Sequence, residues 1–366
     1  MFNPSRLILA RKRRGLTKVA LGRRVGITPK ALGDFESGRM VPSTDAVEQI
    51  ASVTMFPPSF FYRPDIDEPM KEWVSFRSLS TMTAGQRDSA LAAGALAFEL
   101  SAWIEQQFEL PSPNLPDLRD FAPEEGAMAL RAHWGIGERP IGNMVHLLES
   151  EGIRVFSLAE RVRQVDAYSL WYKNLPFMFL NTVKTPEHSR MDAAHELGHL
   201  VLHQHGVPRG RDAEKDAQAF GSAFLMPQGS VRAAVPKPAA PSFQELAALK
   251  LRWRVSLGAL AHRLYSLGLL TEYSYRGVFI QLSRYGRSHE PNGIERESSQ
   301  VLAKVFGALR VDGVTQADAA KQLDLYTNDV EALIFGLSIT PATDGPSRSL
   351  PDAQAVERRR QFKVVS

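Results

Sequence analysis

Two histidines and a glutamate stand together in the middle of the chain, in the run M-D-A-A-H-E-L-G-H-L-V-L-H from Met191 to His203. His195 and His199 are four positions apart, so on a helix both imidazoles lie on one face and can bind one tetrahedral ion. Glu196 points aside from this pair, where it can reach a water on the ion. Zinc lowers the pKa of such a water to about 7, and the carboxylate takes its proton as the water attacks a carbonyl carbon. The residues therefore predict zinc-dependent hydrolysis of a peptide bond, with Glu196 as general base.

The same pattern can occur by chance on an amphipathic helix, and a pattern that stands alone is weak evidence. Here the remainder of the helix is apolar, with Ala193, Ala194, Leu197, Leu200, Val201 and Leu202. A polar stripe buried among such residues needs partners. A bound metal supplies them, so a metal site is favoured over chance.

Three residues compete as the third protein ligand. His203 continues the row of histidines, but a helix rises about 12 Å over eight residues, so His203 is expected to stand behind the site rather than in it. His205 would give a metzincin-like spacing, which requires a glycine where this chain has Leu202. Glu214, on the next predicted helix, would complete a His, His, Glu set with one open position for water.

The run H-E-L-G-H-L-V-L-H, followed after a short loop by E-x-x-A-Q-x-F-x-x-x-F-L-M-P, resembles the ImmA/IrrE family of zinc metallopeptidases, which cleave transcriptional repressors. The resemblance implies that Glu214 is the third zinc ligand. The chain has Gln218 where the family usually has Asn or Asp, and Met191 where it usually has Phe. We expect His203 and Gln218 to orient the ligands from behind.

Composition and charge limit the number of domains, the kind of metal ligand and the location that the protein can have. The 366 residues allow two or three domains, and the absence of cysteine excludes disulfides and thiolate zinc sites. No apolar run approaches the ~18 residues of a membrane span, and the N-terminus lacks a signal-peptide cleavage site. These features predict a cytoplasmic protein without a membrane partner. Net charge is +4, but residues 1–40 carry ten Lys and Arg against Asp34 and Glu36, as expected of a module that binds phosphates.

The basic N-terminus is predicted to form five short helices, over 5–14, 17–25, 29–37 and 44–53 with a last turn near Ser59. Thr17 and Thr28 are predicted N-caps, and Gly26 suits the tight turn between two helices. The segment resembles the Cro/C1-type (XRE) helix-turn-helix family in a skeleton of Leu16, Leu21, Val25, Gly26, Ile27, Leu32, Glu36, Gly38 and Pro42.

That resemblance implies that the second helix of the motif enters the major groove of DNA. Pro29, Lys30 and Asp34 would then face bases, with Lys30 the best candidate to contact guanine. The predicted DNA-binding residues are Thr17, Lys18, Thr28, Pro29, Lys30, Asp34 and Arg39. A helix-turn-helix kept only for docking to protein is the alternative, and the dense local positive charge favours DNA.

A long helix over 84–108 is predicted to pack on the body of the protein, and the proline-rich run at 111–118 marks a boundary after it. Helices over 124–134 and 141–151, a buried strand over 153–158 and a hairpin over 167–181 should follow. The strand before the histidine helix, 177–181, is a candidate docking edge for an extended substrate. Tyr168, Tyr172 and Arg190 are polar candidates to support the oxyanion, whereas His262 is expected to be a surface or packing residue.

The segment 314–336 can be laid on 16–38 without a gap, which predicts a second helix-turn-helix shape. Its acidic residues, Asp318, Asp324, Asp329 and Glu331, oppose only Lys321, so a packing or partner-binding module is favoured over a second DNA reader. The tail from Pro341 is rich in Pro, Ser, Gly and charge and is expected to be disordered.

The predicted fold class is therefore mainly α with a small β-sheet (α+β). We expect a DNA-binding domain at 1–65, a helical connector at 66–122, a zincin-like peptidase domain at 123–284, a helical region at 285–340 and a tail at 341–366. The predicted function is a DNA-binding transcriptional regulator fused to a zinc endopeptidase that cleaves a repressor or antitoxin, with a homodimer possible. The alternative is a regulator that uses the zincin-like fold as a sensor or docking scaffold without turnover.

Overall fold

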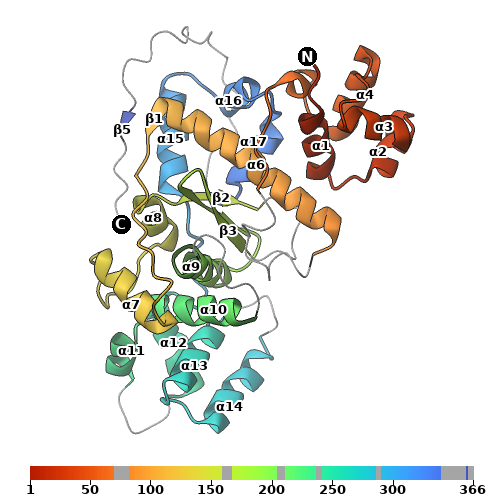
Figure 1. Cartoon of the computed structure of the whole chain (residues 1–366). Coiled ribbons are helices and arrows are strands. Elements are labelled where there is room, and N and C mark those ends of the chain that lie inside the picture. Colours follow the sequence, from red (N-terminus) through yellow and green to blue (C-terminus); the bar gives the residue numbers. More distant parts are fainter. Residues whose placement is uncertain are drawn as a thin grey trace.

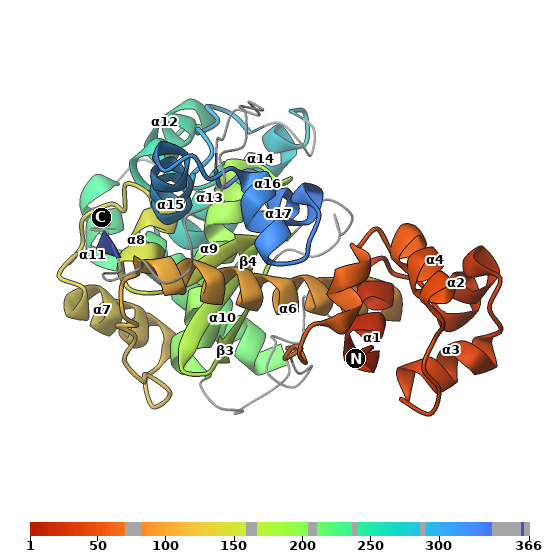
Figure 2. The ribbon, with the colours of Figure 1, turned by 90° about the horizontal axis from the view of Figure 1, so that it is seen from above.

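The computed structural model describes residues 1–69, 82–158, 167–203, 211–235, 241–285, 290–338 and 360–361. Helices form most of this part of the chain, and a three-stranded sheet lies near its centre (Figure 1). The N-terminal helices project from one side, while the other helices gather around the sheet (Figure 2). The predicted α+β class is confirmed.

The N-terminal module consists of α1 (Pro4–Arg13), α2 (Lys18–Val25), α3 (Pro29–Glu36), α4 (Thr44–Thr54) and the 3-10 helix η1 (Pro58–Tyr62). The hydroxyls of Thr17 and Thr28 cap α2 and α3, as predicted. Gly26 ends α2 with a φ of 66°, a left-handed conformation that favours glycine. A Cβ on Gly22 would stand 2.3 Å from the carbonyl oxygen of Ile27, so glycine lets the turn close tightly. These features build the predicted helix-turn-helix.

The long helix α6 (Ala84–Gln107) joins this module to the rest of the molecule (Figure 2). Arg6 of α1 pairs with Glu99 of α6 at 2.5 Å, and the Arg6 side chain is buried. Gly94 lies where a Cβ would come within 2.8 Å of the Tyr168 hydroxyl, so a small residue allows α6 to lie against the sheet. The predicted packing of α6 on the body of the protein is confirmed. The short strand β1 (Phe108–Glu109) follows and pairs with β5 (Arg360–Gln361).

The central sheet contains β2 (Arg154–Ser157), β3 (Ala167–Tyr172) and β4 (Leu175–Leu180), in the order β2-β4-β3. β4 is parallel to β2 and antiparallel to β3. Lys173 and Asn174 turn the β3–β4 hairpin with φ values of 48° and 63°, the conformation that suits the twist of a two-residue hairpin loop. The hairpin is confirmed, but the prediction that 177–181 forms a docking edge is wrong. β4 is the central strand, and its backbone groups already pair on both sides; β3 is an outer strand.

The helices around the sheet are α7 (Pro123–His133), α8 (Met144–Ser150), α9 (Pro186–Leu202), α10 (Arg211–Leu225), α11 (Gln228–Ala234), α12 (Phe243–Trp253), α13 (Leu257–Ser266) and α14 (Glu272–Leu282). α10 packs between α9 and α7, and α9 also lies against β3 and β4. α8 starts three residues later than predicted because Asn143 caps its first turn. α11 to α14 lie on the side of α10 away from the sheet (Figure 1).

The C-terminal helices are α15 (Gln300–Val311), α16 (Gln316–Gln322) and α17 (Thr327–Ile334), and the turn between α16 and α17 repeats the geometry of the turn between α2 and α3. Asp324 takes the left-handed conformation of Gly26, with a φ of 52°, and Gly336 matches Gly38 with 70° against 71°. The N–H of Leu325 bonds the Ala320 carbonyl at 2.8 Å, as Ile27 bonds Gly22 at 2.9 Å. This turn agrees with the expected second helix-turn-helix shape, which stays a prediction for the region as a whole. Five of the eight residues of α17 are buried, and this helix packs against β2 and α6 among other elements.

The two helix-turn-helix modules touch each other. Arg14, just after α1, donates two hydrogen bonds to the Asp329 carboxylate, at 2.8 and 2.7 Å. Arg63 pairs with Asp324 at 2.9 Å. The C-terminal module therefore contacts the N-terminal one through these ion pairs, and its α17 also packs on β2. Most of the tail from 341 lies outside the described residues, so its predicted disorder stays a prediction.

Candidate metal centre and nucleic-acid interface

His195 and His199 of α9 face Glu214 of α10 across the packed helix pair. The two histidine Nε2 atoms are 3.1 Å apart, and the Glu214 carboxylate oxygens lie 3.3 Å from His195 and 3.6 Å from His199. In a tetrahedral site with bonds of about 2.0–2.1 Å, ligand atoms are about 3.3 Å from one another. The separations thus fit one metal ion, and these three residues could hold it.

Two glycines explain how side chains from separate helices come so close. A Cβ on Gly198 of α9 would stand 3.2 Å from the Ala217 Cα, and a Cβ on Gly221 of α10 would stand 2.9 Å from the His195 backbone nitrogen. Larger residues at either position would push α9 and α10 apart. The helices therefore cross at the level of the His195 backbone, which brings Glu214 within reach of both imidazoles.

The charges of the cluster are coupled. Burial disfavours the carboxylate form of Glu214, but hydrogen bonds from His195 and His199 outweigh it and hold its pKa well below the usual range. Burial likewise disfavours protonated His195, yet its hydrogen bond with Glu214 and the charges of Glu196 and Glu214 raise its pKa. Without a metal the cluster is thus best described as a carboxylate facing a readily protonated imidazole. A divalent cation can replace that proton because it binds the same lone pairs.

His203 lies beside His199, with their Nδ1 atoms 3.0 Å apart. Burial and the neighbouring His199 lower the pKa of His203 to about 4, so it is neutral near pH 7. One of the two rings donates a proton to the other, which leaves the Nε2 atom of His199 directed at Glu214. This position agrees with a supporting residue rather than a ligand; the role stays a prediction.

Glu196 is buried, with 1% of its surface exposed, and its carboxylate accepts a hydrogen bond from the Ser169 hydroxyl at 2.8 Å. Ser169 lies on β3, the outer strand next to α9, and was not singled out by the sequence. A serine within an aromatic strand gives no local sign that it meets a glutamate 27 positions later.

Other predicted residues are not part of the cluster. Gln218 is exposed, and among the described residues no hydrogen bond joins it to the three candidate ligands, so its supporting role stays a prediction without structural support. His205 lies outside the described residues. His262 is exposed and rests edge-on against Tyr275, as expected of a surface histidine.

The three oxyanion candidates have other partners. The Tyr168 hydroxyl donates to the Ala90 carbonyl, and burial raises the pKa of this tyrosine far above its usual range. Tyr172 bonds Asp67, and Arg190 forms a buried ion pair with Glu297. We therefore assign these side chains to packing and domain contacts.

The predicted DNA-binding residues lie in or next to α2 and α3, and these helices are on the side of the N-terminal module that faces away from the body (Figure 2). Pro29 and Lys30, in the first turn of α3, are exposed. Asp34 and Arg39 pair with each other at 2.7 Å, and Lys18 pairs with the buried Glu36 at 3.0 Å. The hydroxyls of Thr17 and Thr28 accept backbone N–H bonds and keep a proton that can be donated to phosphate. Lys30 is thus the predicted base-contacting residue best placed to act without breaking an ion pair.

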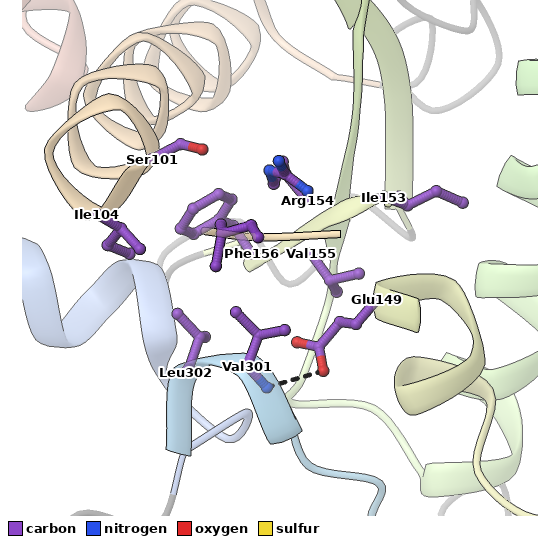
Figure 3. Close-up of a pocket in the computed structure, with 10 residues that line it drawn as sticks. Ser101, Ile104, Glu149, Ile153, Arg154, Val155, Phe156, Val301 and Leu302 are labelled. Atoms are coloured by element: carbon purple, nitrogen blue, oxygen red, sulfur yellow. Dashed lines mark hydrogen bonds between the residues drawn. The ribbon is translucent and has the colours of Figure 1, made fainter. Parts of the chain in front are cut away.

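A cavity of about 20 Å³ lies between α6, β2, α8 and α15, lined in part by Glu149, Arg154 and Val301 (Figure 3). This is room for about one water molecule. It cannot hold a peptide or a cofactor, so it does not compete with the metal centre as a functional site. Within the described residues, no helix is both long and apolar enough to cross a bilayer.

Fold and site together define a class of protein, a helix-turn-helix DNA-binding module joined to a helical domain with a His, His, Glu cluster. Comparison with family models is consistent with this class. Residues 148–265 match the IrrE N-terminal-like domain of peptidase family M78, and residues 5–59 match a helix-turn-helix domain. No curated protein matched the chain. The two matches support a DNA-binding module joined to a peptidase-family domain, and both resemblances seen in the sequence are confirmed.

Proposed function

We propose that this protein is a DNA-binding transcriptional regulator whose second domain is a zinc endopeptidase that cleaves a repressor or antitoxin. The observation that carries the proposal is the cluster of His195, His199 and Glu214 with Glu196 buried next to it on α9. A structural zinc site needs four ligands and no adjacent acid. Three ligands and a neighbouring carboxylate are typical of a hydrolytic site.

In this proposal His195, His199 and Glu214 hold the metal, which supplies Lewis acidity when bound. Glu196 accepts a proton from the water that attacks the peptide carbonyl. As the carbon–nitrogen bond breaks, Glu196 returns that proton to the departing amine, so its charge is restored at the end of the cycle. His203 keeps the ring of His199 in the orientation in which its Nε2 atom faces Glu214.

The exposed α3 carries the proposed contact with DNA. Its Lys30 would approach bases, while the basic N-terminal segment neutralises phosphates, so affinity should fall steeply as salt rises. The same proposal includes domain boundaries at residues 65, 122, 284 and 340. It also includes a homodimer.

The proposal is tested by incubating zinc-loaded protein with the repressor or antitoxin encoded beside its gene. We expect one cleavage product pair, lost with a chelator and restored by zinc. His199→Ala should lose both metal and cleavage. His188→Ala, on an exposed histidine of the same helix, should keep both. Regulation of the target promoter with no shortened partner would instead favour the sensor or scaffold function.

A further inference from the structure

β3 packs along α9. Ser169 and Trp171, two residues apart and therefore on one face of the strand, both point their polar atoms at the helix. The Ser169 hydroxyl bonds the Glu196 carboxylate at 2.8 Å and approaches its carbonyl oxygen at 3.1 Å. The Trp171 Nε1 atom donates to the Leu200 carbonyl at 3.2 Å, one helical turn further on.

The contact at Ser169 differs from the contact at Trp171 in one respect. The Trp171 side chain donates its hydrogen bond to a backbone carbonyl of α9, whereas the Ser169 hydroxyl bonds a side chain that the proposed reaction requires. Both groups of the Ser169–Glu196 pair are nearly closed to solvent, with 3% and 1% of their surfaces exposed. A carboxylate in such surroundings needs hydrogen-bond donors, and a serine hydroxyl is the smallest side chain that supplies one.

We propose that Ser169 is a positioning residue that fixes the carboxylate of Glu196 in the orientation needed for proton transfer. A glutamate side chain has three rotatable bonds, and a hydrogen bond to one carboxylate oxygen selects among its rotamers. Misplacing a general base by a fraction of an ångström slows proton transfer without changing how the substrate binds. This inference rests on the proposed function, since it assumes that Glu196 is the base.

The test compares zinc-loaded wild type with Ser169→Ala, Ser169→Thr and Trp171→Phe, with the repressor or antitoxin encoded beside the gene as substrate. Trp171→Phe is the matched control, because it removes the other side-chain hydrogen bond from this face of β3 to α9 without touching Glu196. We expect Ser169→Ala to lower kcat about tenfold or more while KM changes less than about twofold. Ser169→Thr keeps the hydroxyl on a residue that suits strands and should recover most of the rate. Trp171→Phe should stay near wild type.

A double-mutant cycle separates positioning from mere strand attachment. In a Glu196→Gln background, Ser169→Ala should slow cleavage by no more than about twofold, because the base it serves is gone. Wild type, Ser169→Ala, Glu196→Gln and the double variant are also unfolded in urea in their metal-free form. The effects of the two substitutions on the free energy of unfolding should again not be additive. Additive losses in both measurements, or a Ser169→Ala rate equal to that of Trp171→Phe, would overturn the inference. If wild type cleaves nothing, the proposed function fails, and the role of Ser169 fails with it.

Discussion

The ion pair between Arg14 and Asp329 is expected to hold the N-terminal module against the C-terminal one. The Asp329 side chain is 3% exposed and accepts two hydrogen bonds from Arg14, whose side chain is 18% exposed. Asp329→Asn preserves shape but removes the charge. Removing one partner of a fully buried pair costs about 3–5 kcal/mol. Because Arg14 reaches some solvent and also donates to two backbone carbonyls, we expect about 2 kcal/mol, or roughly 30-fold in the docking equilibrium.

The pair of Arg63 and Asp324 supplies the control. Its side chains are 28% and 29% exposed, so Asp324→Asn should cost only about 0.2–1 kcal/mol. Asn also tolerates the left-handed backbone at this position, which keeps the substitution free of strain. A difference between the two variants then reports the buried contacts of Asp329, with Arg14 and with Arg13 at 3.8 Å, rather than a general loss of acidic charge.

The chain has no cysteine, which makes paired labelling simple. Fluorescent labels on Glu48→Cys in α4 and Tyr273→Cys in α14 report the distance between the module and the body. In increasing urea, the distance distribution should broaden at a lower concentration for Asp329→Asn than for wild type or Asp324→Asn, before the body unfolds. Identical curves for all three proteins would show that this ion pair does not hold the module in place.

Three further predictions concern pH, metal and DNA. Burial raises the pKa of Glu149 to about 7, against 4.5 for the ordinary carboxyl, although Ser299, Gln300 and Val301 donate hydrogen bonds to it. The native state therefore keeps a proton that the unfolded chain has lost, so stability should fall as pH rises from about 4.5 to 7, by up to about 3 kcal/mol. Urea unfolding at several pH values should show this slope, and Glu149→Gln should flatten it; an unchanged slope would contradict the assignment. His203→Phe should weaken zinc binding about 10- to 100-fold in chelator competition, with no change if His203 does not orient His199. Lys30→Ala should cost about 1–3 kcal/mol of specific DNA binding and little non-specific binding, whereas an equal loss on all sequences would make Lys30 a phosphate contact.

Local signals account for what the sequence predicted well. Caps and turns set the limits of α2 and α3 because each depends on a few neighbouring residues, namely Thr17, Thr28 and Gly26. The histidine pair was visible for the same reason, since its geometry follows from the helical repeat. The repeat of the helix-turn-helix shape at 314–336 also came from local spacing alone.

Features that depend on how distant elements meet were missed or wrongly placed. The order β2-β4-β3 is set by pairing across the sheet, and no local pattern indicated that β4 would be central. The bond from Ser169 to Glu196 and the pair of Arg14 with Asp329 join separate elements, the latter across 315 positions. Glu214 could be proposed from the sequence, but its approach to the histidines depends on Gly198 and Gly221, whose importance appears only when α9 and α10 are packed.

The central claim is that Glu196 performs proton transfer at a metal held by His195, His199 and Glu214. The most direct test measures cleavage of the partner repressor or antitoxin by zinc-loaded wild type and Glu196→Gln, with zinc content and DNA affinity measured on the same samples. We expect Glu196→Gln to keep zinc and DNA binding while cleavage falls by about 10²-fold or more. Equal cleavage by both proteins, or no shortened partner with either, would contradict it.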